Sequence, residues 1–352
     1  MGSCFSLISL SFLSFFSNAN GGASSLSSVF SDKNFLFAAS GLTSLLLLQE
    51  YFNRKNGAQA QDEEQIKENE EGNSNYRRAD YEIDSRKDLL QTIQRDGDDC
   101  FKLKLVQIIK LNHDSYFYKF DFPNKNQELG LEIGGHIVFH ADCVDAETGD
   151  VLKVVKKYTP TSWLHQKGSV DFVVKIYRAG VHPDFPNGGR MTQYLEKLEV
   201  GQYLTMSGPV AKKIYKGNGN FYIAKEHQVK KNVGMVSGGT GITPFYQIIQ
   251  QVVKYRDSIK ISLVYGNKSE KDILLKDELD SLQKQYPENI SITYIIDKAE
   301  NPQKWKGETG YITKEILDSY LPAPSDDTII FTCGPKPMNN LVRKFLTDHF
   351  VV

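Results

Sequence analysis

Two glycine-containing turns in the C-terminal third constrain the fold of this 352-residue chain more than any other feature. The first turn is Ser237 to Pro244 (SGGTGITP), and the second is Cys333 to Met338 (CGPKPM). Each follows a short apolar run typical of a strand, at 233–236 and at 328–332, and each precedes a helical pattern. An open α/β sheet uses strand, glycine turn and helix to present backbone N–H groups to a phosphate-bearing ligand. The pair therefore predicts a nucleotide-binding parallel sheet with a thiol at the mouth of its crevice.

The first turn also predicts where its helix begins. Thr243 suits the N-cap position, because its hydroxyl can accept a hydrogen bond from the first turn of a helix. Pro244 suits the first helical position, where a missing N–H costs nothing. We therefore expect the helix to run over about 245–255.

Composition limits the remaining possibilities. The chain has 40% hydrophobic and 24% charged residues and is long enough to bury two cores. Its formal net charge of −1 gives no reason to expect nucleic-acid binding. The four cysteines, at positions 4, 100, 143 and 333, are widely spaced and form no CxxC pair. We therefore expect no disulfide framework and no metal site, and a reducing compartment such as the cytosol for the catalytic part.

Residues 1–52 differ from everything after them, since no charged side chain precedes Asp32. The apolar stretch 35–48 is followed by two aromatic residues and then by Arg54 and Lys55, which indicates a membrane anchor or targeting segment. It is shorter than the roughly 20 residues that span a bilayer comfortably, so a signal-peptide core and a buried helix stay open as alternatives. We expect attachment to the outer mitochondrial membrane or the endoplasmic reticulum.

The extreme N-terminus matches a lipidation pattern as well. Gly2 is followed by Ser3, Cys4 and Ser6, which fits N-myristoylation with Cys4 placed for a second acyl chain. Residues 53–97 are polar, with acidic clusters, and are expected to form a solvated tether.

The rest of the chain divides into two patterns. Residues 98–228 hold short alternating runs separated by glycine turns, which predicts an antiparallel β-barrel domain. Residues 229–352 alternate strands with helices, which predicts a parallel α/β domain. In the second domain we expect a helix over 276–285 and a strand over 290–296, besides the elements that flank the two turns.

Two motifs in the barrel carry candidate binding groups. Lys156 to Ser162 (KKYTPTS) places cations, a phenol and hydroxyls in one strand and turn. Alternation along a strand would point Lys156, Tyr158 and Pro160 to one face, toward a ligand with both a phosphate and a flat ring. Gly188 to Thr192 reads as a helix N-terminus able to bind a pyrophosphate. Taken alone, the first motif is also a strand end with solvated lysines, and the second an ordinary capped helix.

The motif set resembles the NADH–cytochrome b5 reductase family of flavin and pyridine-nucleotide reductases over roughly 101–338. The family's Arg-x-Tyr-Thr-x-x-Ser signature is matched by Lys156 to Ser162, with Lys in place of Arg. Its Gly-(Lys/Arg)-Met-(Ser/Thr) motif falls on Gly189 to Thr192. The stretch Gly180 to Gly189 is typical of these reductases and of the matching nitrate reductase domain, and Leu263 to Leu275 is similar to fungal mitochondrial members.

The resemblance implies a membrane-anchored enzyme in which an FAD-binding barrel precedes an NADH-binding α/β domain. Thr240 and Cys333 would be the catalytic residues at the site of hydride transfer. Asp297 would accept hydrogen bonds from the adenosine ribose and repel a 2′-phosphate, so NADH is preferred over NADPH. The implied cofactor contacts are Lys156, Lys157, Tyr158, Thr159, Ser162, Val173, Lys175, Arg178, Gly189, Arg190, Met191, Thr192, Gly238, Gly239, Thr240, Thr243, Asp297, Cys333, Gly334 and Pro335.

The acceptor implied by the family is cytochrome b5 or a similar haem protein. The haem signature of cytochrome b5 and a molybdenum domain are both missing from the sequence, so the electrons are expected to leave for a separate protein. The alternatives are a quinone or another acceptor, or a membrane-anchored binding protein that has lost its flavin. Lys156 prompts the last alternative, because lysine keeps the charge of the usual arginine but loses its planar bidentate fork.

Overall fold

The computed structural model describes residues 100–145, 148–181, 183, 185–347 and 351–352. The chain divides into two compact units, 1–77 and 78–352, and every described residue belongs to the second unit. The predicted anchor (1–52) and tether (53–97) lie outside the described residues. Within the described part, no helix is both long enough and apolar enough to cross a membrane.

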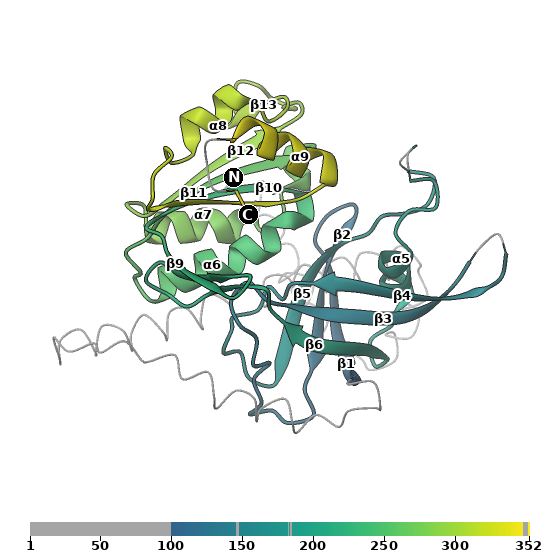
Figure 1. Ribbon diagram of the computed structural model, residues 1–352. Coiled ribbons are helices and arrows are strands. Elements are labelled where there is room, and N and C mark those ends of the chain that lie inside the picture. The colour runs from purple at the N-terminus through teal and green to yellow at the C-terminus, as the bar shows by residue number, and fades with distance from the viewer. Residues whose placement is uncertain (1–99, 146–147, 182, 184, 348–350) are drawn as a thin grey trace, which may run out of the picture. The chain divides into compact units, whose positions relative to one another are not determined.

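The first half of the described chain (100–229), here called the barrel lobe, is built on a six-stranded antiparallel sheet with the order β4-β3-β6-β1-β2-β5 (Figure 1). Since β4 and β5 form its two edges, the predicted barrel is an open half-barrel. Its elements are β1 (Cys100–Lys110), β2 (Ser115–Asp121), β3 (His136–Val144), β4 (Val151–Tyr158), β5 (Ser169–Lys175), α5 (Arg190–Lys197) and β6 (Tyr203–Val210).

Alternation along these strands produces the core of the barrel lobe. In β1, Phe101, Leu103 and Leu105 are buried, while the lysines between them face solvent. They meet Phe139 and Phe172 from other strands, and Met191 and Leu195 of α5 close the same core. A separate three-stranded antiparallel sheet ends the barrel lobe and consists of β7 (Lys213–Tyr215), β8 (Asn220–Ile223) and β9 (Glu226–Val229).

The second half (232–352), here called the sheet lobe, holds a five-stranded parallel sheet with the order β13-β12-β11-β10-β14. Helices α6 and α7 lie on one side of this sheet, and α8 and α9 lie on the other (Figure 1). The elements are β10 (Asn232–Gly238), η2 (Gly239–Gly241), α6 (Ile242–Lys254), β11 (Lys260–Asn267), η3 (Glu270–Asp272), α7 (Lys276–Gln285), β12 (Ile290–Ile296), β13 (Glu308–Thr309), α8 (Lys314–Tyr320), β14 (Thr328–Cys333) and α9 (Lys336–Phe345).

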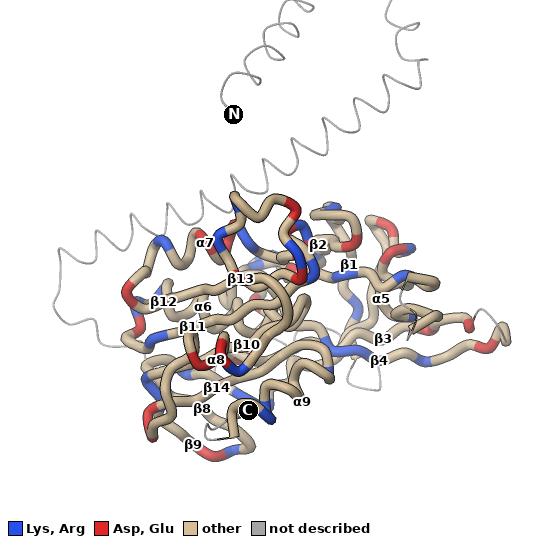
Figure 2. Tube along the Cα trace, turned by 90° about the horizontal axis from the view of Figure 1, so that it is seen from above, with Lys and Arg blue, Asp and Glu red and all other residues tan. Residues whose placement is uncertain are grey.

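Charge is mixed over both lobes. Figure 2 shows Lys and Arg interspersed with Asp and Glu along the trace, as expected for a chain with a net charge near zero. The expected helix over 276–285 and the expected strand over 290–296 have the bounds of α7 and β12.

The predicted start of the helix after the first turn is wrong. The 3-10 turn η2 runs directly into α6, so the helix begins at Ile242 and Gly241 takes the N-cap position. Thr243 lies inside the helix, where its hydroxyl donates to the Thr240 carbonyl at 3.2 Å instead of accepting a capping bond. Pro244 is therefore the third helical residue.

Candidate functional site

The two glycine turns lie side by side at the carboxyl edge of the parallel sheet. Strand β10 pairs with β14, and the two end together with Ser237 opposite Cys333. A Cβ added to Gly241 would lie only 2.0 Å from the Cys333 carbonyl oxygen. A Cβ on Gly238 would lie 2.7 Å from Met338 Sδ. The two turns are thus packed closely at positions where only glycine fits, at the edge of the sheet where open α/β sheets bind their ligands.

Groups along this crevice fit a dinucleotide. The Ser237 hydroxyl is fully buried and has no hydrogen-bond partner among the residues that the structure describes. Gly239 has φ +53, and a Cβ built there would meet no atom within 4 Å, so its backbone borders open space. A buried hydroxyl without a partner, such as that of Ser237, is normally satisfied by a ligand or a water.

The buried phenol of Tyr265 holds the first turn in place by a hydrogen bond. Tyr265 of β11 donates its hydroxyl to the Gly239 carbonyl at 2.9 Å and accepts the Leu274 N–H at 3.3 Å. Burial raises the pKa of Tyr265, so the hydroxyl keeps its proton and acts as a permanent donor to the turn. Sequence reasoning missed this role, because the residue stands in an ordinary apolar strand pattern.

The Cys333 thiol lies at the end of β14. Burial raises the pKa of Cys333, and the nearby Lys213 ammonium opposes that change only in part. The thiol therefore stays protonated at neutral pH, which suits a group that shapes a site without acting as a nucleophile. Thr240, the other predicted catalytic residue, is half-buried in η2 on the neighbouring turn.

The first predicted flavin motif lies at the end of edge strand β4. Lys156 and Lys157 are exposed, and the Tyr158 ring stacks on Phe139 with centroids 4.4 Å apart. The strand ends at Tyr158, so the expectation that Pro160 continues the same strand face is wrong. Pro160 is instead buried in the following loop.

This loop is fastened to β5. The Ser162 hydroxyl accepts the Asp171 N–H at 3.2 Å, and the Thr161 N–H donates to the Asp171 carbonyl at 2.9 Å. Thr159 is half-buried in the same loop, and Val173 of β5 is buried. The charged and aromatic groups of β4 are thus held beside a rigid turn.

The second predicted flavin motif is the start of α5, as expected. Gly189 takes the N-cap position, and its carbonyl accepts the Thr192 hydroxyl at 2.9 Å. That hydroxyl also accepts the Tyr177 N–H at 3.1 Å, which ties the helix to the loop after β5. The first N–H groups of a helix attract an anion such as a pyrophosphate, so the motif fits FAD.

The arginines near α5 are already paired with carboxylates. Arg190 contacts Asp145 at 2.6 Å, and Arg178 contacts Glu196 at 2.6 Å. The hydrogen bond to Glu196 is the main reason that the pKa of Arg178 is raised. Their predicted contacts with a cofactor would therefore form beside these ion pairs or exchange with them.

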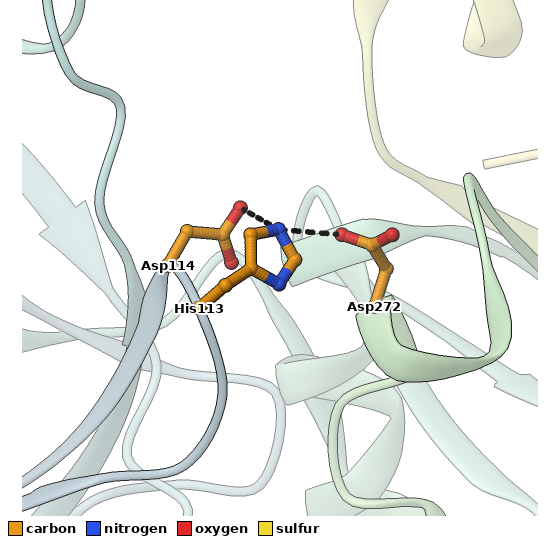
Figure 3. A group of neighbouring side chains, drawn as sticks. All are labelled: His113, Asp114 and Asp272. Atoms are coloured by element: carbon orange, nitrogen blue, oxygen red, sulfur yellow. Dashed lines mark ion pairs between the residues drawn. The ribbon is translucent and has the colours of Figure 1, made fainter.

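Lys175, another predicted cofactor contact, connects the two lobes. Its ammonium lies 2.9 Å from Asp114 Oδ2 in the barrel lobe and 2.9 Å from Asp272 Oδ1 in the sheet lobe. His113 Nε2 lies 3.2 Å from Asp114 and 3.6 Å from Asp272 (Figure 3). Burial alone would lower the pKa of Lys175, but the hydrogen bonds to the two aspartates outweigh it and raise the pKa.

The same three side chains would be close enough to share a metal ion, since the ligand atoms of His113, Asp114 and Asp272 lie within 4.8 Å of one another. The Lys175 ammonium already takes the place between the two carboxylates that such an ion would need. We therefore interpret the group as an ion-pair cluster.

The last predicted contacts lie at the edge of the sheet lobe. Asp297 follows β12 and is exposed, and its N–H donates to the carbonyls of Asn267 and Lys268 at 3.2 Å. Strand β12 is separated from β10 by β11, so Asp297 lies two strands away from the first turn in the sheet. Gly334 and Pro335 connect β14 to α9, and Pro335 is the N-cap of that helix.

Comparison with known families agrees with this arrangement. Residues 102–215 match the oxidoreductase FAD-binding domain, and residues 235–344 match the oxidoreductase NAD-binding domain. The fold and the site therefore define a two-domain oxidoreductase that uses FAD and NADH.

Individual relatives narrow the class. The cytochrome b5 reductase domain of Ulva prolifera nitrate reductase has a TM-score of 0.67 and 34% identity, covering 73% of this chain and 98% of that one. The NADH nitrate reductases of Solanum lycopersicum and Hordeum vulgare are 42% and 41% identical over 67% of this chain. This chain belongs to the NADH–cytochrome b5 reductase family of ferredoxin reductase-like flavoproteins. It spans about a quarter of the length of those nitrate reductases, at 25% and 26%.

Proposed function

We propose that this protein takes a hydride from NADH and passes single electrons to cytochrome b5 or a similar haem protein. The observation that carries the proposal is the close contact between the two glycine turns at Gly241 and Cys333, at the carboxyl edge of the parallel sheet. FAD, when bound, supplies the conversion of a two-electron donor into one-electron steps. The chain supplies binding, orientation and electrostatics.

Each part of the site has a separate task in this proposal. The N-terminus of α5 would hold the pyrophosphate of FAD together with Lys156, and Tyr158 would contact the flavin ring. Thr240 and Cys333 stand on the two neighbouring turns and would align the nicotinamide of NADH. No covalent step at the protonated Cys333 thiol is needed, because the size and weak polarity of the side chain are enough to form one wall of the nicotinamide site.

The acceptor is inferred from charge and from relatives. Lys157 and Lys212 are exposed, and both lie close enough to His136 to add to the effect of burial in lowering its pKa, so they form a positively charged surface suited to an acidic haem protein. The Ulva relative is a cytochrome b5 reductase domain of a nitrate reductase, which supports a haem acceptor of the cytochrome b5 type here. A quinone or another acceptor, and a binding protein without flavin, are the competing functions.

A reconstitution experiment separates these functions. Full-length protein purified in detergent should be yellow, or become so with FAD, and should reduce cytochrome b5 with NADH. Reduction should slow as salt rises, and Lys212→Glu should flatten that dependence. Colourless protein that takes up no FAD would exclude the enzyme, whereas reduction of quinone but not of cytochrome b5 would correct the acceptor.

We also propose that residues 1–52 attach the enzyme to a membrane, with the catalytic lobes facing the cytosol. The support is the apolar stretch 35–48 and the lipidation pattern at Gly2. Localisation of a C-terminally tagged full-length protein, beside Gly2→Ala and a variant with four serines at 45–48, distinguishes lipid attachment from an apolar anchor. Uniform cytosolic signal for the unaltered protein would refute attachment.

A further inference from the structure

One neutral side chain crosses from the sheet lobe to the barrel lobe next to the predicted site. Gln247 lies on α6, and its amide nitrogen donates to the Pro160 carbonyl at 3.1 Å. Its amide oxygen accepts the Gly134 N–H at 3.0 Å. The side chain is only 7% exposed, so both bonds are shielded from water.

The two bonds join three separate segments of the chain, namely α6, the loop before β3 and the predicted flavin segment. Pro160 belongs to the predicted flavin segment 156–162. Gly134 precedes β3 and has a φ of +91, a backbone conformation that favours glycine. A Cβ there would meet the Lys213 carbonyl at 2.4 Å, so the position of Gly134 is fixed by backbone on the other side.

Gln247 also lies on the same face of α6 as Thr243 in the first turn of the helix. It follows Thr243 by four residues, and residues at that spacing share one helix face about 6 Å apart along the axis. Thr243 in turn donates to the Thr240 carbonyl. The helix that Gln247 fastens to the flavin segment is therefore the same helix whose first turn is bonded to Thr240.

We propose that Gln247 is a positioning residue that fixes the first turn relative to the flavin segment, and so sets the geometry of hydride transfer. The inference rests on the proposed function. An amide suits this task because it is both donor and acceptor at once, so it specifies one orientation of the two lobes. The Lys175 ion pairs also join the lobes, but through flexible charged side chains.

Three variants test the proposal. Gln247→Leu removes both bonds at similar volume, and Gln247→Glu keeps the acceptor for Gly134 but turns a second oxygen toward the Pro160 carbonyl. Gln251→Leu is the matched control, since Gln251 lies one turn further on α6, is 1% exposed and has no side-chain hydrogen bond among the described residues.

We expect Gln247→Leu to bind FAD normally and to bind NADH within about threefold of the unaltered protein. Flavin reduction at saturating NADH should slow by about 10- to 100-fold, as expected for a small misplacement of reacting groups. Gln247→Glu should also reduce its flavin slowly at neutral pH. Its rate should rise toward that of the unaltered protein at low pH, where the protonated carboxyl can again donate to the Pro160 carbonyl. Gln251→Leu should keep the original rate.

A readout independent of turnover is hydrogen exchange at Gly134. Its N–H should exchange at least tenfold faster in Gln247→Leu than in the unaltered protein or in Gln251→Leu. Unchanged exchange, or faster exchange with an unchanged rate of flavin reduction, would overturn the positioning role. If NADH fails to reduce the flavin of the unaltered protein, the proposed function fails instead, which is a separate result.

Discussion

The contact between Gly241 and the second turn predicts a large effect from one methyl group. In Gly241→Ala the new Cβ would lie 2.0 Å from the Cys333 oxygen, 2.5 Å from its carbonyl carbon and 2.9 Å from the Gly334 nitrogen. Real Cβ atoms essentially never approach closer than 3.0 Å, so the turns must separate by about 1 Å. The backbone of Gly241, with φ −63 and ψ −9, accepts alanine without strain, so the clash is the whole effect.

The magnitude follows from that displacement. All three atoms are backbone, and Cys333 is held in β14, so no side chain can rotate away. A misplacement of about 1 Å at a reacting centre costs on the order of 100-fold in rate. Overpacking should also lower the free energy of unfolding by about 1–3 kcal/mol.

Anaerobic stopped-flow reduction by NADH measures the rate, and Gly234→Ala provides the control. A Cβ at Gly234 would meet Ile330 Cγ1 at 2.9 Å and Leu321 Cδ2 at 3.3 Å, which are side-chain atoms inside the same sheet lobe. It should lose comparable stability and keep its rate within about threefold. A Gly241→Ala protein that holds FAD and is reduced at the original rate would refute the claim that this contact shapes the site.

Three further predictions concern charge. Burial acts to raise the pKa of Asp272, but the hydrogen bonds from Ser269 and Lys175 outweigh burial, and the pKa is lowered. The ionised Asp272 therefore stabilises the folded protein above about pH 4, and this stabilisation is lost as the pH falls further. Asp272→Asn should therefore cost about 1–3 kcal/mol at pH 7 in urea unfolding, with the difference shrinking in acid. Cys333 should react slowly with iodoacetamide at pH 7, and Lys213→Gln should slow it further, because that ammonium lowers the thiol pKa. In Asp297→Ala, the ratio of kcat/KM for NADH to kcat/KM for NADPH should fall about tenfold. An unchanged ratio would show that Asp297 does not contact the ribose.

Local patterns predicted the elements of the fold well. The helix α7 and the strand β12 have the expected bounds, because each is defined by its own periodicity and its own turn residues. The two glycine turns were expected at one crevice, since parallel strands end at the same edge of a sheet. The start of α6 was missed, because a 3-10 turn that continues into a helix displaces the cap from Thr243 to Gly241.

Contacts between distant segments were beyond the reach of those patterns. Gln247 stands in an apolar helix pattern, and its partner Pro160 is 87 residues away. Lys175 and Asp272 are 97 residues apart, so nothing in either local sequence indicates that they pair. Such side chains are recognised only when packing brings their elements together, whereas phosphate-binding turns carry their function in adjacent residues.

The most direct test of the central claim is an anaerobic titration of the FAD-loaded, full-length protein with NADH, followed by flavin absorbance. If the two lobes form one site for FAD and NADH, one equivalent of NADH per FAD should bleach the flavin absorbance completely within the mixing time of a manual experiment. NADPH should reduce the flavin far more slowly. A flavin spectrum that stays unchanged at several equivalents of NADH would contradict the account.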